Sequence, residues 1–174
     1  ITFDEEELYD LEVVFFKKGL KKNYRLFKGC WWQKPNEVRK EYTARGLPVE
    51  KLENNNLLQI VDLGLRYNQY GIPGVINTWV KEAEKAIQLG QKALWGSAAP
   101  HTLSCQNDFK NLLELEATLE KTLDLYPVVG ICPYTFQDLK NHDYRQILEL
   151  IKHHKNIVFK DETEDILLTK DELE

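Results

Sequence analysis

The stretch Tyr-Pro-Val-Val-Gly-Ile-Cys-Pro-Tyr, residues 126–134, decides the fold class of this chain. Proline has no backbone N–H for pairing within a sheet, so Pro127 and Pro133 bound a short strand. The apolar residues between them do not alternate with polar ones, which is typical of a strand covered by helices on both faces. Cys132 and Tyr134 then follow at the carboxyl end of the strand, where open α/β sheets bind their ligands.

Helical and strand patterns alternate along the rest of the chain. We expect helices at residues 4–18, 35–46, 75–90, 109–123 and 144–153, a helical turn at 136–141, strands at 24–32, 57–63, 92–96, 126–134 and 156–160, and loops at 67–74 and 97–107. Lys28-Gly29 inside the first of these strands indicates a bulge. Strands that alternate with helices pair in parallel through right-handed crossovers. The sequence therefore predicts an α/β fold, a three-layer α/β/α sandwich around a mostly parallel sheet of about 5–7 strands.

Length and composition set the class of protein. The 174 residues, 43% of them hydrophobic, suit one compact domain over residues 1–160, with an acidic tail at 161–174 that contains a further edge strand at 166–169. The net charge of −5 and the lack of a basic stripe argue against direct nucleic-acid binding. No apolar run approaches the roughly 20 residues that span a membrane, and no signal peptide is visible. Three scattered cysteines indicate reduced thiols in a cytoplasmic protein.

The sequence begins at Ile1 and contains no methionine, so we expect it to be a fragment whose ends are not native. It also lacks the common catalytic motifs: a G-x-x-x-x-G-K-[ST] loop, a G-x-G-x-x-G turn and a G-x-S-x-G elbow. Cysteine and histidine spacings do not indicate a zinc site, so we expect no catalytic residue, no cofactor and no metal.

The adjacent histidines and the glutamate cluster can both be explained by exposure to solvent, without a binding role. His153 and His154 are adjacent, so on a helix they point about 100° apart, and a solvated helix end explains them. The acidic cluster of Glu114, Glu116 and Glu120 is interpreted as the solvated face of its helix.

The candidate ligand contacts follow the strand ends. Tyr134 offers apolar area and a hydroxyl, although packing alone would also explain it. Cys132 is either a ligand-contacting or redox-sensing thiol or a small buried hydrophobe. Trp31 and Trp32 reach the same sheet edge, but neighbouring strand residues face opposite sides, so at most one of them lines a given pocket.

Three further residues complete the candidate site. Trp95 is either a pocket residue or part of the core, whereas Trp79, at helical spacing, is expected in the core. Asp62 is a candidate acceptor at a strand end, and His101 is a candidate donor from a loop.

A succession of short patterns runs through the chain. These are Phe-x-x-x-Gly-Leu at 15–20 with Phe16, Arg-Gly-Leu-Pro-Val at 45–49, Leu-x-Ile-x-Asp at 58–62, Tyr-x-x-x-Gly at 67–71, Trp79 before Glu82-Ala83, Leu-x-Leu-Glu at 113–116, Val-x-x-x-Cys-x-Tyr at 128–134, and His-x-x-Ile-Val at 154–158. Their order, over roughly residues 4–160, resembles the MEDS family, the methanogen/methylotroph DcmR-type sensory domain.

The resemblance implies a RecA/KaiC-like domain without a phosphate loop, from an archaeal or bacterial protein. Its implied role is that of a non-catalytic sensory module for a small organic (C1 or methylated) compound, coupled to a kinase or DNA-binding effector and capable of forming a homodimer. The chain departs from the family pattern in two places. Its first strand is reduced to residues 1–3, and residues 94–100 read Leu-Trp-Gly-Ser-Ala-Ala-Pro instead of a Gly-Glu-x-x-Trp-like turn.

Three alternatives stay open at this point. A degenerate nucleotide binder would rely on base stacking against tryptophan or tyrosine. An enzyme would use Cys132 as nucleophile and His101 as base. A structural interaction domain would lack a pocket. A sensor also needs a mobile element, for which the loops at 70–74 and 97–107 are the candidates.

Overall fold

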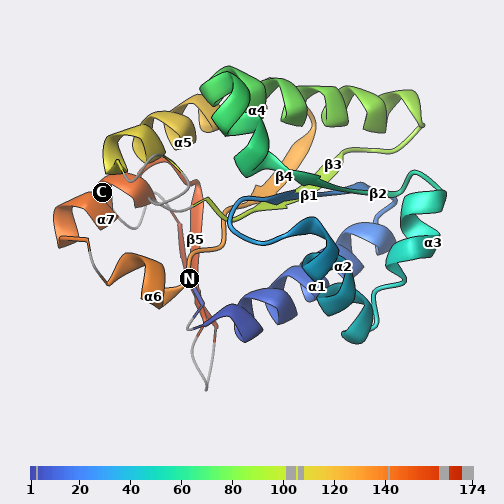
Figure 1. The fold of residues 1–174 in the computed structure, drawn as a ribbon, viewed down its shortest axis with the longest axis horizontal. Coiled ribbons are helices and arrows are strands. Elements are labelled where there is room, and N and C mark those ends of the chain that lie inside the picture. The colour runs from blue at the N-terminus through green and yellow to red at the C-terminus, as the bar shows by residue number, and fades with distance from the viewer. Residues whose placement is uncertain (3, 101–104, 106–107, 141, 161–164, 170–174) are drawn as a thin grey trace.

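The computed structural model describes residues 1–174 except 3, 101–104, 106–107, 141, 161–164 and 170–174 (Figure 1). Its central sheet is parallel and has the strand order β2-β1-β3-β4. The strands are β1 (Arg25–Cys30), β2 (Leu58–Asp62), β3 (Leu94–Ala98) and β4 (Val128–Ile131). The predicted parallel α/β class is confirmed. Within the described residues this sheet has four strands, so the predicted five to seven are not confirmed.

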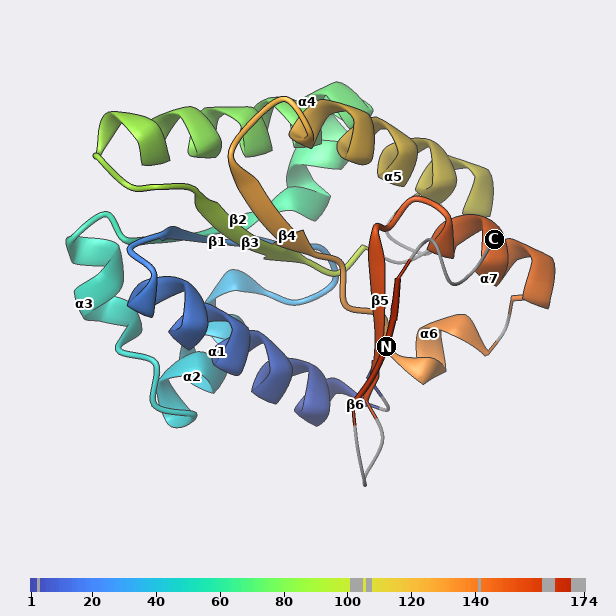
Figure 2. The same ribbon diagram turned by 180° about the vertical axis from the view of Figure 1, so that it is seen from behind.

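Helices lie on both faces of the sheet (Figures 1 and 2). One face carries α1 (Glu5–Lys21), α2 (Pro35–Ala44) and α3 (Val49–Asn54), and the other carries α4 (Leu63–Gln88) and α5 (Phe109–Leu123). Neighbouring strand residues divide between the two sides: Leu26 packs in the core beneath α1 and α2, and Phe27 in the core beneath α4 and α5. The alternation of side chains along a strand therefore builds two cores from one sheet. The short helix α3 was not predicted.

The chain after β4 adds a further unit beyond the carboxyl end of that strand (Figure 2). It contains α6 (Phe136–Leu139), α7 (Tyr144–Ile151), and the strands β5 (Asn156–Lys160) and β6 (Asp165–Thr169). We expected β5 to extend the parallel sheet, but it pairs with β6 in an antiparallel hairpin. The connection between these two strands is too short for a parallel crossover, which explains the difference.

Strand β1 runs through the centre of the sheet without the predicted bulge. Lys28 pairs with Ile60 on one side and Ser97 on the other, and Gly29 continues both ladders. The glycine has a packing reason instead: a Cβ at Gly29 would lie 2.2 Å from Cδ1 of Leu63. Leu63 opens α4, so the close approach of that helix to the strand requires glycine here.

The loop predicted at residues 67–74 is wrong, because α4 runs through it. The helix is kinked at Gly71, where φ is 62° and ψ is −157°, and Pro73 follows inside it. Gly71 is outside helical geometry, so α4 consists of two helical segments that meet at a kink. The candidate mobile loop at 70–74 is consequently the kink between two helical segments. Of the other candidate, residues 97–98 belong to β3, and 101–104 and 106–107 lie outside the described residues.

Asp4 caps the start of α1, because its side chain accepts a hydrogen bond of 3.0 Å from the backbone N–H of Glu7. The helix passes the expected stop at Gly19 and ends at Lys21. The buried face includes Glu12, whereas Val14 is 51% exposed.

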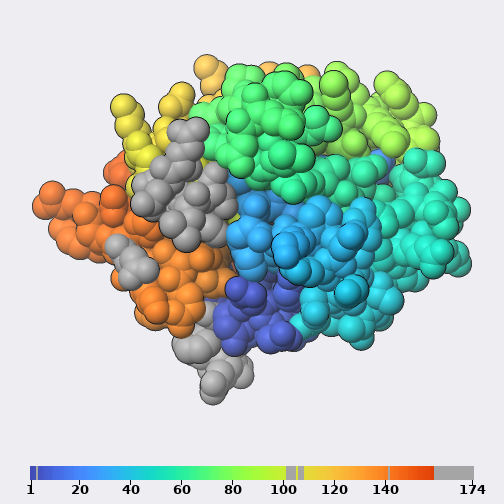
Figure 3. All heavy atoms as spheres, viewed as in Figure 1, coloured from blue at the N-terminus to red at the C-terminus, as the bar shows by residue number. Residues whose placement is uncertain are grey.

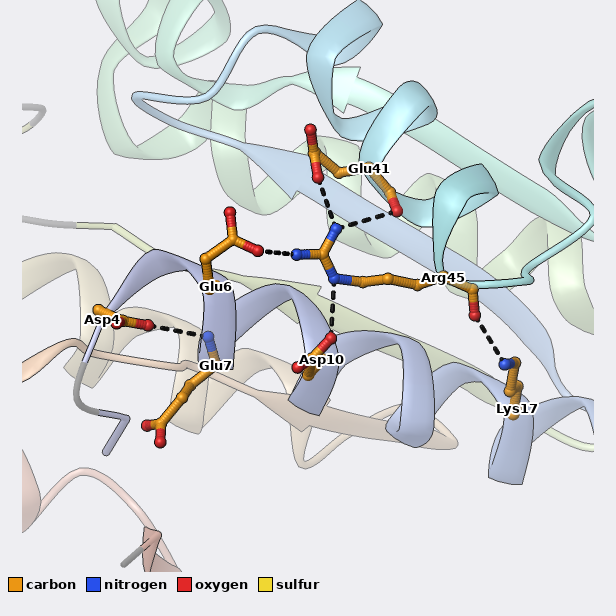
Figure 4. Close-up of polar contacts among 7 residues, drawn as sticks. All are labelled: Asp4, Glu6, Glu7, Asp10, Lys17, Glu41 and Arg45. Atoms are coloured by element: carbon orange, nitrogen blue, oxygen red, sulfur yellow. Dashed lines mark hydrogen bonds and ion pairs between the residues drawn. The ribbon is translucent and has the colours of Figure 1, made fainter. Parts of the chain in front are cut away.

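Arg45 connects the first two helices on the molecular surface (Figure 4). Its guanidinium group donates to Asp10 of α1 at 2.8 Å and to Glu41 of α2 at 2.5 Å, and it also contacts Glu6. The Lys17 ammonium donates to the Arg45 carbonyl at 2.9 Å. Exposed ion pairs contribute little stability individually, so this network mainly fixes the relative orientation of α1 and α2.

Candidate functional site

A cavity of about 250 Å³ lies at the carboxyl end of β4. Its walls come from elements far apart in sequence. They are Ile1, Leu11 and Phe15 near and within α1, residues 130–134 of β4 and its exit, Leu139 of α6, Ile147, Leu150 and Ile151 of α7, His154, and residues 156–158 of β5. Most of these side chains are apolar. The cavity therefore occupies the sheet edge at which the sequence predicted a binding site.

The polar side of the cavity is organised around Glu116, which is only 2% exposed. This residue lies on α5, and Tyr134 donates a hydrogen bond of 2.5 Å to its Oε1 atom. The Cys132 thiol faces the other carboxylate oxygen, with 3.5 Å between Sγ and Oε2. Cys132 and Tyr134 line the cavity, and Glu116 lies behind them. The prediction of a solvated acidic face holds for Glu114 but is wrong for Glu116.

His154 approaches the same carboxylate from the segment between α7 and β5. Its Nε2 atom lies 3.7 Å from Oε2 of Glu116, and its Nδ1 atom lies 3.1 Å from the carbonyl oxygen of Leu150. The neighbouring His153 is 3.4 Å from Oε2 of Glu120. Both histidines are half-buried, so the prediction of a solvated helix end is wrong. The turn after α7 directs both rings toward α5.

Burial controls the protonation of the two groups that face Glu116. It raises the pKa of the Cys132 thiol well above its ordinary value, and the negative charge of Glu116 adds to this effect. The same two causes raise the pKa of the Tyr134 phenol. Both side chains are therefore neutral hydrogen-bond donors near neutral pH. A nucleophilic thiol requires the opposite shift, toward the thiolate.

A second buried polar cluster lies on the opposite face of the sheet, under α1 and α2. Lys28 of β1 forms an ion pair with Glu12 of α1, with 2.6 Å between Nζ and Oε1. Tyr42 donates to Oε2 of Glu12 at 2.6 Å, and Ser97 donates to Oε1 at 2.5 Å. All four residues are fully buried, and both carboxylate oxygens are satisfied. Because these side chains interact with one another and line neither described pocket, the cluster is structural.

The three predicted tryptophans lie elsewhere. Trp31 is buried against Tyr67, with 5.6 Å between ring centroids. Trp95 is also in the core, where it stacks on Phe15 at 4.6 Å and donates to the Phe15 carbonyl. Trp32 lines a separate surface hollow. No tryptophan occurs among the described residues that line the cavity, although Phe15 places an aromatic ring in its wall.

The two predicted polar residues also lie apart from the cavity. Asp62 caps α4 by accepting a hydrogen bond of 2.7 Å from the backbone N–H of Leu65. Its position at a strand end therefore has a local structural explanation. His101 lies outside the described residues.

The hollow beside Trp32 is acidic. It lies between the start of α1 and α6, whose atoms adjoin on the face shown in Figure 3. Asp4, Glu5, Glu6 and Asp138 line it. Burial raises the pKa of the Glu5 carboxyl, and the neighbouring Asp138, Glu6 and Asp4 raise it further. This hollow is consequently unfavourable for an anionic ligand.

Sequence reasoning missed Glu116 and His154 as parts of the site. Glu116 could have been found, because it lies four residues after Leu112 and three before Leu119, on the apolar stripe of its helix. A charged residue on a buried stripe requires a partner. His154 had no comparable signal, since its position depends on the turn after α7.

The fold is that of a mixed α/β domain with a largely apolar pocket at the carboxyl end of β4. A family model described as MEDS, MEthanogen/methylotroph, DcmR Sensory domain, matches residues 1–155. The chain therefore belongs to the MEDS family of sensory domains, which confirms that part of the sequence-based resemblance. No curated protein and no solved structure matches the chain. The RecA/KaiC-like relationship stays a prediction. None of the described helices has the length and apolarity needed to cross a membrane.

Proposed function

We propose that this chain is a non-catalytic sensory module that binds a small organic molecule in the cavity at the end of β4. The observation that carries the proposal is the cavity itself. It is largely apolar, and it has a short row of polar groups on one side, formed by Cys132, Tyr134 and His154. Such a combination of apolar walls and a few placed polar groups is typical of small-molecule sites. Membership of a sensory family supports the same function.

The size of the cavity favours a compact ligand. An apolar cavity of about 150 Å³ is sufficient for benzene, and this one measures about 250 Å³. A C1 or methylated compound, or a somewhat larger relative, fits these dimensions. A nucleotide is less suitable, because no lysine or arginine occurs among the described residues that line the cavity. Phosphate groups usually require such cations or a phosphate loop.

The arrangement of the walls indicates how binding could produce a signal. Leu11 and Phe15 of α1 line the same cavity as Ile147 of α7 and Ile157 of β5. A ligand in this space would contact all three elements and favour the state in which they are closest. A ligand shifts such an equilibrium only through different affinities for the two states. The partner in this proposal is a kinase or a DNA-binding effector, and the sensor acts as a homodimer.

Catalysis is the less supported alternative. Cys132 is the only predicted nucleophile, and burial beside Glu116 raises its pKa. This environment favours the thiol over the reactive thiolate. We therefore retain a binding role for Cys132.

Thermal shift measurements test the proposal. The chain is titrated with C1 and methylated sulfur compounds and, separately, with ATP and cyclic nucleotides. Ile147→Trp, which places a larger side chain in the cavity wall, is compared with Ile87→Trp on the exposed side of α4. We expect at least one small compound to raise the melting temperature of the parent chain and of Ile87→Trp, but not of Ile147→Trp. A response to nucleotides alone, or an unchanged response in Ile147→Trp, would contradict the proposal.

A further inference from the structure

Three potential metal ligands from separate elements converge beside the cavity. The Oε2 atom of Glu116, the Sγ atom of Cys132 and the Nε2 atom of His154 all lie within 4.8 Å of one another. Glu116 comes from α5, Cys132 from the segment after β4, and His154 from the segment between α7 and β5. Residues 116 and 154 are 38 positions apart in the sequence, so the group does not form a short Cys/His motif that could be recognised from the sequence.

The hydrogen bonding of His154 leaves one ring nitrogen directed at Glu116. A carbonyl oxygen can only accept a hydrogen bond, so Nδ1 is the nitrogen that donates to Leu150. In the neutral ring Nε2 then carries a lone pair. This atom is buried, has no hydrogen-bond partner among the described residues, and faces the carboxylate oxygen at 3.7 Å. Either a proton on the ring or a metal cation can occupy the space between these two acceptors, and the Cys132 sulfur, 3.5 Å from the same carboxylate oxygen, adds the third ligand atom that a metal ion uses.

The hydrogen bonds that orient His154 and Glu116 are also those of a metal site. Metal-binding histidines commonly donate their other ring N–H to a backbone carbonyl, as His154 does to Leu150. The carboxylate is oriented in the same way. Tyr134 occupies Oε1 of Glu116, which leaves Oε2 as the oxygen shared by Cys132 and His154. One carboxylate oxygen is thus fixed by the protein, and the other remains available to a cation.

We propose that Glu116, Cys132 and His154 bind a zinc ion. Tetrahedral Zn²⁺ with one sulfur and two lighter ligands separates those ligand atoms by about 3.3–3.6 Å. The observed distances from Oε2 of Glu116 are 3.5 Å to Cys132 and 3.7 Å to His154. Thiolate, imidazole and carboxylate form a ligand set that suits zinc, and the thiolate disfavours calcium and magnesium.

Three protein ligands leave one position of a tetrahedral ion unfilled. Cys132 and His154 line the cavity, whereas Glu116 lies behind them, so the fourth position faces the cavity. This part of the inference rests on the proposed function: the ion would bind a donor atom of the small ligand, such as a thiol or an alcohol. Zinc binding itself does not depend on that function.

Titration of the full chain with Co²⁺ and Zn²⁺ tests the metal site. We expect one Co²⁺ per chain, a thiolate-to-Co²⁺ charge-transfer band in the near ultraviolet, displacement by Zn²⁺, and release of about one thiol proton measured by calorimetry in two buffers. His154→Ala and Glu116→Gln should each weaken Zn²⁺ binding more than about tenfold, since loss of a group that only hydrogen-bonds to a metal ligand already costs about 10–100-fold. Cys132→Ser should abolish the band.

Matched controls separate the site from its surroundings. His153→Ala removes the adjacent imidazole, and Cys105→Ala removes another buried thiol, and both should bind Zn²⁺ like the parent chain. Circular dichroism establishes that each variant is folded. The metal site is disproved if the parent chain gives no charge-transfer band, or if His153→Ala and His154→Ala bind Zn²⁺ equally. If zinc binding fails while the small-molecule thermal shift persists, the proposed function stands and only the metal site is lost.

Discussion

Tyr134 and Glu116 are joined by a buried hydrogen bond of 2.5 Å that connects the exit of β4 to α5. The phenol donates and the carboxylate accepts, and burial keeps the phenol protonated because its pKa is raised. Hydrogen bonds to a charged acceptor are among the stronger ones in proteins. This bond fixes the carboxylate around which the polar side of the cavity is built.

Removal of this hydroxyl should destabilise the domain. We expect Tyr134→Phe to lower the free energy of unfolding by about 1–3 kcal/mol, because a buried carboxylate oxygen loses its donor. Urea unfolding followed by circular dichroism measures the change. Tyr144→Phe, at an exposed position on α7, is the control and should stay within about 0.5 kcal/mol of the parent chain. Equal values for the two variants would contradict the role of the bond.

The buried ion pair on the other face provides a second prediction. Lys28→Met should cost about 3–5 kcal/mol of stability, because the Glu12 carboxylate stays buried without its cation. Adding Glu12→Gln removes that charge, so the double variant should lose less than the sum of the two single changes. Chemical unfolding of all three variants gives the coupling energy. Strict additivity would mean that the pair does not interact.

Two glycines paired across the sheet give a matched test of packing. Gly96 and Gly130 are register partners in β3 and β4. A Cβ at Gly96 would lie 2.3 Å from the Trp79 indole, whereas one at Gly130 would be 4.0 Å away. We expect Gly96→Ala to destabilise the protein by about 1–3 kcal/mol through overpacking. Gly130→Ala should be tolerated. Thermal unfolding of both variants measures the two losses of stability, and a larger loss for Gly130→Ala than for Gly96→Ala would contradict the prediction.

Stability should fall at alkaline pH. Burial is the largest cause of the raised pKa in each buried thiol and phenol. It raises the pKa to about 12 for Cys30, Cys105 and Tyr9, and well above the ordinary value for Cys132, Tyr42 and Tyr134. The unfolded chain loses these protons near pH 8.5 for thiols and near pH 10 for phenols, about their usual pKa values. Between those values and the raised ones the folded state binds more protons.

The free energy of unfolding therefore decreases as pH rises above about 8.5, by up to about 1.4 kcal/mol per pH unit for each such group. Urea titrations of the metal-free chain between pH 7 and pH 10.5 measure this slope. Replacing Cys30 and Cys105 by alanine should make the decrease shallower between pH 8.5 and 10. A stability that is constant over this range would show that the thiols and phenols ionise as easily in the folded protein as in the unfolded one.

The sequence allowed the parallel sheet to be predicted because its strands are short apolar runs between helical patterns. Residues 58–62 are one example, since turn residues and a helix signal bound them. Residues 128–131 also form a strand, but β4 lies at the edge of the sheet with Val129 39% exposed, so the prediction that helices cover this strand on both faces is wrong. The boundaries of helices were harder to predict where loop-forming residues lie inside a helical segment. Gly71 and Pro73 are typical of a loop, yet they form only a kink, with Gly71 non-helical and helical segments directly before and after it.

The candidate site could be located only in part. Cys132 and Tyr134 follow a predicted strand, and the structure places both in the wall of the cavity. Their partners depend on tertiary structure: Glu116 on which face of α5 is buried, and His154 on a turn far along the chain. Trp95 was a candidate for the pocket but lies in the core, because an aromatic residue in a strand can pack in either place and the sequence does not distinguish them.

Isoleucine methyl NMR tests the central claim, that the cavity at the end of β4 is the ligand site, most directly. Ile131, Ile147 and Ile157 line the cavity, and Ile60 and Ile76 do not. The chain is labelled at its isoleucine δ-methyl groups and titrated with the C1 or methylated compound that gives the largest thermal shift. We predict saturable shifts of the Ile131, Ile147 and Ile157 signals with those of Ile60 and Ile76 unchanged. Unchanged cavity signals during a titration that shifts Ile60 or Ile76 would contradict the claim.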